Sequence, residues 1–296
     1  MDAKPPPAEA SPVDDFAAAR LLHPSAYPRA GRTEARTCTH IAVGGAVIGG
    51  GGFTLVAGPC AVESYEQLRE TAFALKAIGV RLIRAGAFKP RTSPYSFQGL
   101  HHQALDLIAR VKAETGLAFV TELMSPELVE AVTAVVDVVQ IGSRNMQNFP
   151  LLRAAGRLKQ PVLLKRGFGN TLHELLMSAE YVMNEGNDRV ILCERGIRTF
   201  DPAQRNTLDL MAAPVLKSVT HLPVLVDPSH ALGRREFVPA AIKAALAVGA
   251  DGVLVEVHPQ PEAALSDGRQ SITPAALAAL VDELKVLAAA TGRRLF

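Results

Sequence analysis

The sequence has no tryptophan, only three cysteines and almost no excess of charge of either sign. Cys38, Cys60 and Cys193 are odd in number and widely spaced, which argues against a disulfide framework and favours a reducing compartment. The 31 lysines and arginines nearly balance the 29 acidic residues, so a nucleic acid partner is not expected. The hydrophobic content of 48% excludes a chain that is disordered throughout.

The sequence also lacks a convincing membrane segment. Residues 41–62 carry no charge and could reach across a bilayer, but seven glycines and Pro59 argue against a spanning helix. The first residues lack the apolar core of a signal peptide, so we expect a cytoplasmic protein with no membrane partner. Residues 1–35 begin with a Pro/Ala-rich stretch and are predicted to form a disordered or extended tail.

Residues 36–296 alternate between short β-branched runs and longer amphipathic segments. The short runs are typical of buried parallel strands, and helix-capping residues support several of the longer segments. The predicted strands are 53–57, 80–84, 118–122, 136–141, 162–165, 190–194, 224–227 and 252–256. The predicted helices are 65–78, 99–115, 126–134, 149–158, 171–184, 206–220, 235–248 and 274–290.

Eight strand and helix units of this total length predict an α/β fold, the (β/α)8 or TIM barrel, as a single catalytic domain over residues 36–296. An open doubly wound sheet is the alternative, but it rarely needs eight such regular units. Residues 41–48 place Gly44-Gly45 between two short apolar runs, which predicts a β-hairpin that closes the bottom of the barrel.

Polar residues follow every predicted strand, at the barrel end where catalytic groups lie in this fold. Because the strand interiors are nearly all apolar, ionisable residues at all eight ends indicate an active site rather than chance. In chain order these residues are Cys60, Arg84, Glu122, Arg144, Lys165, Arg195, Asp227 with His230, and Glu256 with Asp267.

Four of these residues could bind one divalent metal. Cys60, His230, Glu256 and Asp267 supply a thiolate, an imidazole and two carboxylates from the first, seventh and eighth strand ends, which are neighbours in a closed barrel. This mixed set indicates a first-row transition ion or zinc rather than calcium or magnesium. Taken singly, each residue is better explained without a metal, Cys60 as a buried hydrophobe, His230 as a loop histidine and the two carboxylates as solvated charges; only their joint position on adjacent strand ends favours the metal site.

A second group at the strand ends is cationic. Six cations at one barrel mouth indicate a substrate with more than one anionic group, although surface charges paired with acids remain the alternative for Arg91 and Arg195. The group consists of Arg84, Lys89, Arg91, Arg144, Lys165 and Arg195. The glycines of GGAVIGGGG precede a strand rather than open a helix, so dinucleotide binding is not expected. GFGN after Lys165 favours either a close approach of the backbone to a ligand or a tight turn.

The motifs AGPCAVES, RAGAFKPRTSPYSFQG, IGSRNMQN, KRGFGNTLHELLMSAEY, CERGIRTFD, DPSHALGRR and EVHPQPEAALSDGRQS resemble the type I beta group of 3-deoxy-D-arabino-heptulosonate 7-phosphate (DAHP) synthases. The resemblance runs from about residue 36 to the end of the sequence. Small departures are Ala85 and Ser143, which leave the charged positions unchanged. The resemblance implies a transferase that opens the shikimate pathway, towards chorismate and the aromatic amino acids.

The resemblance also implies roles for individual residues. Phosphoenolpyruvate would contact Arg84, Lys89, Arg144, Lys165 and Arg195, and erythrose 4-phosphate would contact Arg91, Thr92, Ser93 and Asp227. Lys165, Lys89, Glu122 and His230 would be catalytic. Cys60, His230, Glu256 and Asp267 would hold one divalent ion, with Mn²⁺ as first choice and Fe²⁺, Co²⁺ or Zn²⁺ as alternatives. The resemblance further implies a homo-oligomer, either a tetramer or a dimer.

Three alternatives remain open. The sister enzyme 3-deoxy-D-manno-octulosonate 8-phosphate synthase uses arabinose 5-phosphate and usually reads KANRSS where this sequence reads KPRTSP. A Schiff-base aldolase would use Lys165 as nucleophile without a metal. A catalytically silent binding barrel is the third. Members of the DAHP synthase group often carry an appended regulatory domain, for which residues 1–35 are too few, so we expect no intrinsic feedback inhibition.

Overall fold

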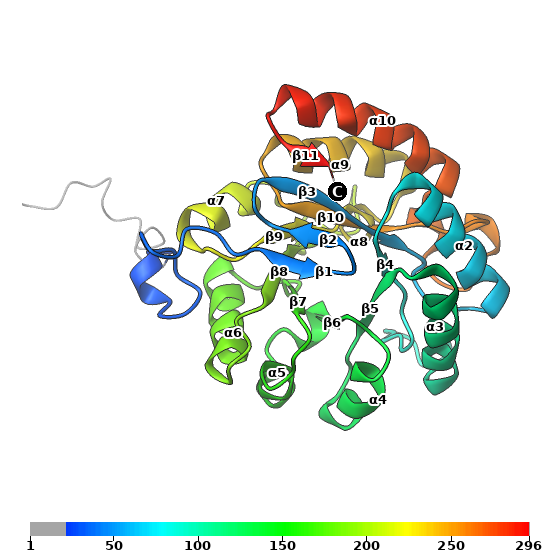
Figure 1. The fold of residues 1–296 in the computed structure, drawn as a ribbon, viewed down its shortest axis with the longest axis horizontal. Helices are drawn as coiled ribbons and strands as arrows, with labels where there is room; N and C mark the ends of the chain where they lie inside the picture. The colour runs from blue at the N-terminus through cyan, green and yellow to red at the C-terminus, as the bar shows by residue number, and fades with distance from the viewer. Residues whose placement is uncertain (1–21, 296) are drawn as a thin grey trace, which may run out of the picture.

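The computed structural model describes residues 22–295, which form a closed barrel of parallel strands surrounded by helices (Figure 1). Strands pair in chain order, and the last pairs with the first from Gly252 opposite Thr54 to Glu256 opposite Gly58. This pairing closes the sheet and confirms the predicted (β/α)8 barrel. Its strands are β3 (Gly52–Gly58), β4 (Leu82–Arg84), β5 (Ala118–Glu122), β6 (Val138–Ile141), β7 (Val162–Lys165), β8 (Val190–Glu194), β9 (Val224–Val226) and β10 (Gly252–Glu256).

The side chains of the barrel strands alternate between two buried layers. In β3, Leu55 and Ala57 pack between the sheet and the helices, whereas Val56 packs with Leu163 and Leu254 inside the barrel. Because both faces of the sheet are covered, the strands are apolar along their whole length rather than at every second residue. The strands could therefore be recognised as continuous apolar runs.

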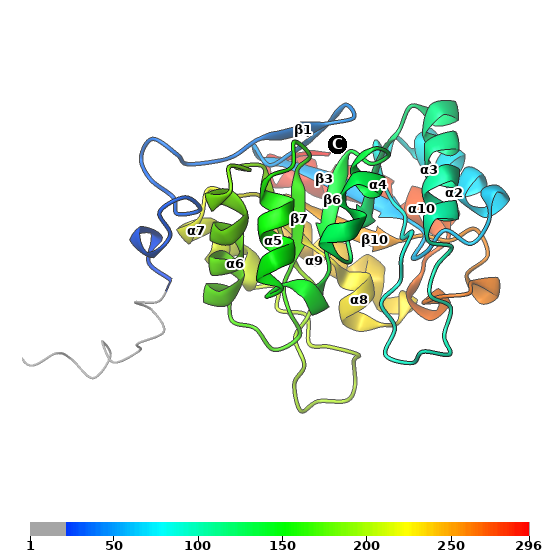
Figure 2. The same cartoon turned by 90° about the horizontal axis from the view of Figure 1, so that it is seen from below.

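A hairpin closes the amino-terminal end of the barrel, as the sequence predicted. Its strands β1 (Ile41–Val43) and β2 (Ala46–Ile48) pair antiparallel through a turn in which Gly44 and Gly45 have φ values of 56° and 81°. Positive φ at both turn positions favours glycine. Three apolar hairpin side chains join the cluster inside the barrel. Figure 2 shows the hairpin at one end of the barrel and the long loops after the strands at the other.

Helices cover the outside of the barrel, one after nearly every strand. Ser64 caps α2 and Thr273 caps α10, while Thr171 and Glu174 form a reciprocal capping box at the start of α6. The helices are α2 (Tyr65–Ile78), α3 (His102–Thr115), α4 (Val129–Thr133), α5 (Phe149–Gly156), α6 (Leu172–Asn184), α7 (Ala212–Val219), α8 (Pro228–Leu232), α9 (Val238–Ala247) and α10 (Pro274–Ala290).

Several helix boundaries differ from those predicted. The helix predicted over 206–220 begins only at Ala212, because the preceding loop forms a bridge between Ile197 and Thr207 and Asn206 donates a hydrogen bond to the carbonyl of His230. The short helix α8 was not predicted, since five residues are too few to show a helical period. None of the helices among residues 22–295 has the length and apolarity that crossing a bilayer requires.

Residues 22–35 pack against the outside of the barrel, although the sequence predicts a disordered or extended tail there. Tyr27 and Ala30 are almost fully buried, and Gly31 forms a bridge with Thr220. The carboxylate of Glu180 accepts hydrogen bonds from two successive amides, at 2.9 and 2.7 Å. Ordered packing therefore begins before residue 36, whereas residues 1–21 of the predicted tail lie outside the described residues.

Candidate active site

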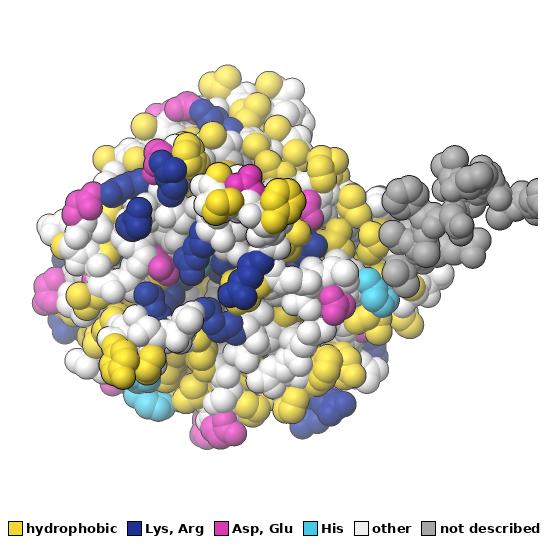
Figure 3. Space-filling model, turned by 180° about the vertical axis from the view of Figure 1, so that it is seen from behind, with side chains coloured by type: hydrophobic (Ala, Val, Ile, Leu, Met, Phe, Trp, Pro, Cys, Tyr) yellow, Lys and Arg dark blue, Asp and Glu magenta, His cyan; other side chains and the backbone are white. Residues whose placement is uncertain are grey.

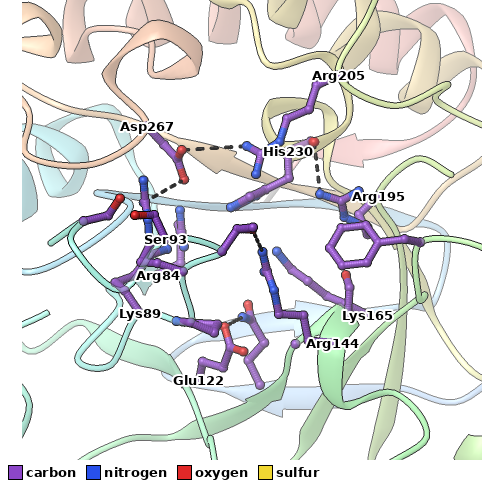
Figure 4. A pocket seen from close by; sticks show the side chains of 18 residues that line it. Arg84, Lys89, Ser93, Glu122, Arg144, Lys165, Arg195, Arg205, His230 and Asp267 are labelled. Carbon is purple, nitrogen blue, oxygen red and sulfur yellow. Dashed lines mark hydrogen bonds and ion pairs between the residues drawn. The ribbon is translucent and has the colours of Figure 1, made fainter. Parts of the chain in front are cut away.

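The loops after the barrel strands surround a cavity of about 250 Å³. Figure 3 shows lysine and arginine side chains gathered around a hollow on this face, and Figure 4 shows the lining residues from close by. Most of the predicted site residues line this cavity, namely Arg84, Lys89, Arg91, Thr92, Ser93, Glu122, Arg144, Lys165, Arg195, His230 and Asp267. The other three, Cys60, Asp227 and Glu256, are at most 2% exposed and contact the lining residues from beneath.

Cys60, His230, Glu256 and Asp267 meet at one side of the cavity. Each offers one ligand atom, and these atoms all lie within 4.8 Å of one another. Ligand bonds to zinc and similar ions are about 2.0–2.3 Å long, so one ion could reach all four atoms. A thiolate, an imidazole and two carboxylates also suit a borderline transition ion. The residues present therefore fit a divalent metal of this class.

The barrel topology explains why these four residues meet. Cys60 lies just after β3 and Glu256 ends β10, and these two strands are paired where the barrel closes. His230 lies in α8, which directly follows β9. Asp267 lies in the loop after β10, with a left-handed backbone at φ 54°. Residues far apart in the sequence thus become neighbours.

Cys60 is a buried thiol with two polar neighbours. It donates a hydrogen bond of 3.1 Å to Asp267 and accepts one of 2.8 Å from the hydroxyl of Ser266. Burial, together with the negative charge of Glu256, raises the pKa of the Cys60 thiol to about 12. A free thiol would therefore stay protonated at neutral pH, and metal binding would displace this proton.

Glu256 is one of the four donors and is held by three neighbouring side chains. Its carboxylate pairs with the guanidinium of Arg84, accepts a hydrogen bond of 2.6 Å from Gln270, and lies 3.1 Å from Nε2 of His230. Burial alone would raise the pKa of Glu256, but its interactions with His230 and Arg84 outweigh burial and lower the pKa well below its usual range. Glu256 is therefore ionised and available as a ligand.

Asp227 connects the donor set to the cationic group. It caps α8, accepts a hydrogen bond of 2.7 Å from Nδ1 of His230 and forms an ion pair of 2.5 Å with Nζ of Lys165. Burial opposes its charge, but His230 and Lys165 outweigh burial and hold the pKa of Asp227 well below its usual range. The bond to Nδ1 leaves Nε2 facing Glu256, as metal-binding histidines require.

The predicted cations line the rest of the cavity. Arg84 and Lys165 are buried and paired with carboxylates, whereas Arg195 is 3% exposed and donates only to backbone carbonyls among the described residues. Burial disfavours the charged form of Lys89, yet its electrostatic interactions with the acidic groups of Cys60, Glu256 and Asp267 raise its pKa overall. Lys89 is therefore positively charged at neutral pH, and the cavity can neutralise more than one anionic group.

Glu122 is one of two carboxylates, with Asp267, that line the cavity within residues 22–295. Gln140 donates a hydrogen bond of 3.2 Å to its Oε2. A Cβ at Gly142 would lie only 2.0 Å from Oε1, so the absence of a side chain there gives the carboxylate room. The position of Glu122 thus depends on two residues of the neighbouring strand end.

Other residues around the cavity were not among the predicted site residues. Gln140 had a usable signal, because it is a polar residue inside the apolar run of β6, and Ser266 and Gln270 lie within the motif LSDGRQS. Phe168 lies in GFGN, for which a backbone approach to a ligand or a tight turn was predicted, but no role for the side chain. Arg205 lines the cavity and lies 3.7 Å from Asp267, but it lies in a long loop without periodicity that gave no signal.

Known proteins resemble this chain over most of its length. Residues 32–290 match the DAHP synthetase I family. The phospho-2-dehydro-3-deoxyheptonate aldolase of Thermotoga maritima is 53% identical over 254 residues, which cover 86% of this chain and 75% of that protein. The 2-dehydro-3-deoxyphosphooctonate aldolase of Magnetococcus marinus is 34% identical over 252 residues, covering 79% of this chain and 87% of that protein.

Solved structures agree with this assignment. The crystal structure of the Thermotoga maritima phospho-2-dehydro-3-deoxyheptonate aldolase (DAHP synthase) superposes with a TM-score of 0.88 at 50% identity, covering 91% of this chain and 79% of that one. A truncated form of the Thermotoga maritima 3-deoxy-D-arabino-heptulosonate 7-phosphate synthase gives a TM-score of 0.84 at 47% identity, covering 90% of this chain and 98% of that one. The sequence match, the identity and the shared fold together establish that this chain belongs to the DAHP synthetase I family.

Proposed function

We propose that this protein condenses phosphoenolpyruvate with erythrose 4-phosphate and water to give DAHP and inorganic phosphate, the first step of the shikimate pathway. The observation that carries the proposal is one cavity that joins a four-residue donor set for a metal to a ring of cations. Two small phosphorylated substrates need both features, because one aldehyde must be activated and several anionic groups must be neutralised. The DAHP synthase relatives support this choice.

Phosphoenolpyruvate would bind among Arg84, Lys89, Arg144, Lys165 and Arg195. These cations come from the ends of β4, β6, β7 and β8 and line the same cavity. Erythrose 4-phosphate would bind in the loop with Arg91, Thr92 and Ser93, where hydroxyls and a guanidinium suit a phosphate.

Asp227 was expected near the sugar hydroxyls, but its complete burial favours another role. Its Oδ2 contacts both the imidazole of His230 and Nζ of Lys165, and its Oδ1 accepts a hydrogen bond from the backbone amide of His230. We therefore assign Asp227 a positioning role, in which it orients the imidazole and keeps the ammonium of Lys165 near the substrate.

Cys60, His230, Glu256 and Asp267 would hold one divalent ion, for which Mn²⁺ is our first choice and Fe²⁺, Co²⁺ and Zn²⁺ are alternatives. When bound, such an ion supplies a Lewis acid for the aldehyde oxygen of erythrose 4-phosphate. Elemental analysis of protein purified without chelators identifies the ion.

The remaining chemistry depends on the charged residues. C3 of phosphoenolpyruvate attacks the aldehyde carbon, water adds at C2, and the resulting hemiketal phosphate loses inorganic phosphate. Lys89 and Lys165 lie beside the cavity as proton donors or as fixed positive charges for the developing alkoxide and the phosphate. Glu122, whose carboxylate accepts a hydrogen bond from Gln140, would orient the water that adds at C2.

The sister enzyme that uses arabinose 5-phosphate is the nearest alternative. The loop KPRTSP and the higher identity to the Thermotoga enzyme, 53% against 34%, favour the four-carbon sugar. The test supplies purified protein with phosphoenolpyruvate and each aldose phosphate in turn, and follows phosphate release. We expect turnover with erythrose 4-phosphate; turnover only with arabinose 5-phosphate would reverse the assignment.

A Schiff-base aldolase and a silent barrel fit the geometry less well. Lys165 is buried and its Nζ is held by the carboxylate of Asp227, which leaves it poorly available to attack a carbonyl carbon. Borohydride added with substrate should therefore trap no adduct on Lys165. A silent barrel would have no need for the complete set of donors and cations.

The homo-oligomeric state and the cytoplasmic location stay predictions. Light scattering of the purified protein should give the mass of a dimer or a tetramer rather than of one 31.4 kDa chain.

A further inference from the structure

We propose that Phe168 positions Arg144 and Arg195 for an anionic substrate group while leaving their positive charge intact. The proposal rests on the proposed function, which assigns both arginines to phosphoenolpyruvate. Phe168 would act through these two residues and not by direct chemistry, so it is a positioning residue.

The ring of Phe168 lies among arginines from two different loops. The guanidinium carbons lie 5.3 Å from the ring centroid for Arg144, 4.8 Å for Arg195 and 4.8 Å for Arg198. Arg144 follows β6 and the other two follow β8, while Phe168 follows the strand between them. The amide of Arg198 also donates a hydrogen bond of 2.7 Å to the carbonyl of Phe168. One aromatic ring thus contacts arginines from the loops after both neighbouring strands, β6 and β8.

Arg144 and Arg195 differ from the two cations that end β4 and β7. Arg84 and Lys165 are each held by a buried carboxylate. Within residues 22–295, neither Arg144 nor Arg195 forms an ion pair; Arg195 donates to the carbonyls of Gly196 and His230, and Arg144 to the hydroxyl of Thr92. Their position therefore depends on backbone, hydroxyl and ring contacts.

An aromatic ring holds an arginine in a way that suits phosphate binding. The electron-rich face attracts the guanidinium and leaves the N–H groups at its edge free for a phosphate or carboxylate. A carboxylate would occupy those N–H groups and cancel the charge. Two unneutralised arginines beside one ring would form a preorganised site for one anionic group.

The test compares Phe168→Leu, which removes the ring, with Phe168→Tyr, which keeps it. Binding of phosphoenolpyruvate and of inorganic phosphate is measured by calorimetry on protein as purified, and kcat and KM are measured separately. We expect Phe168→Leu to weaken phosphoenolpyruvate binding about tenfold and to raise its KM more than it lowers kcat. Phe168→Tyr should stay within about twofold of wild type, since tyrosine keeps the aromatic face.

Phe73→Leu is the matched control, because Phe73 forms a similar pair with Arg69, at 4.7 Å, on the outer surface of α2. It should leave phosphoenolpyruvate binding unchanged. A double-mutant cycle then asks whether Phe168 acts through Arg195. Once Arg195 is alanine, Phe168→Leu should weaken binding less than it does in wild type.

Wild-type affinity in Phe168→Leu, or effects of Phe168→Leu and Arg195→Ala that simply add, would overturn the proposal. Failure of the proposed function gives a different result. Wild type would then release no phosphate with erythrose 4-phosphate, while the coupling measured by phosphoenolpyruvate or phosphate binding would remain.

Discussion

The two ends of the barrel carry opposite chemistry on the same eight strands. At the amino-terminal end, apolar side chains of the hairpin β1–β2 fill the opening and join the interior cluster. At the carboxyl end, buried charges meet in a polar cavity. The apolar interior separates the two ends, so stability and substrate chemistry should respond to different substitutions.

The difference also explains why whole-chain charge is a poor guide to this site. The formal net charge is only +2, yet seven cations line one cavity: Arg84, Lys89, Arg91, Arg144, Lys165, Arg195 and Arg205. Many of the acidic residues that offset these positive charges in the whole-chain count lie elsewhere, for example Glu283, which pairs with Lys243 on the outer helices. Local arrangement, rather than composition, therefore indicates phosphorylated substrates.

The largest contrast should come from cysteines at the two ends. Cys60→Ala removes one of the four donors and should lower turnover by about a hundredfold or more, together with the bound metal. Cys38→Ala is the matched control, because Cys38 is exposed just before the hairpin. Phosphate release and metal content are measured on both. Equal activity of the two variants would show that Cys60 has no role in the active site.

Two arginines flank β8 and allow a comparison on a single strand. Arg195→Ala at the carboxyl end should raise the KM for phosphoenolpyruvate by about ten- to a hundredfold, because a charged hydrogen-bond donor is lost. Arg189 at the other end donates hydrogen bonds of 3.0 Å to the carbonyls of Ala42 and Lys159. Arg189→Ala should lower the free energy of unfolding by about 1 kcal/mol and leave the KM unchanged. Steady-state kinetics and urea unfolding are measured on both variants. A raised KM in Arg189→Ala, or an unchanged KM in Arg195→Ala, would contradict the comparison.

The hairpin should contribute to stability and not to chemistry. Ile48 is fully buried in the interior cluster, so Ile48→Ala should lower the free energy of unfolding by about 2–5 kcal/mol. Turnover measured well below the melting temperature should stay at the wild-type value. A change in KM for either substrate would mean that the two ends are coupled through the interior.

The smallest expected effect concerns the hairpin turn. Gly45 has a φ of 81° with open space around it, so Gly45→Ala should cost about 1 kcal/mol of backbone strain and cause no clash. Thermal unfolding should show a small decrease in melting temperature with unchanged activity. An unaffected melting temperature would indicate that the turn can change its conformation.

Much of this fold could be predicted from sequence because its signals are local. Strands buried on both faces read as apolar runs, and Gly44-Gly45 marked the hairpin. The packing of residues 22–35 could not be predicted, since two of their amides are satisfied by Glu180, a residue distant in the sequence. The short helix α8 depends on the cap by Asp227 and has no period of its own.

The candidate site was predictable where residues directly end strands and less so where they lie in loops. Glu256 and Lys165 are the last residues of their strands, so the predicted barrel fold was enough to place both at its carboxyl end. Arg205 lies in a loop whose path depends on tertiary hydrogen bonds, and the arginine contacts of Phe168 join loops from different strands. Contacts between loops of this kind leave no periodic pattern in the sequence from which they could be predicted.

The central proposal is that the four donors at the carboxyl end would hold one divalent ion, and that turnover requires it. A titration of chelator-treated protein with Mn²⁺, followed by electron paramagnetic resonance and by phosphate release from phosphoenolpyruvate with erythrose 4-phosphate, tests it most directly. We expect bound Mn²⁺ to saturate at one ion per chain and turnover to rise in parallel from near zero. Full turnover in the metal-free protein, unchanged as Mn²⁺ is added, would contradict the claim.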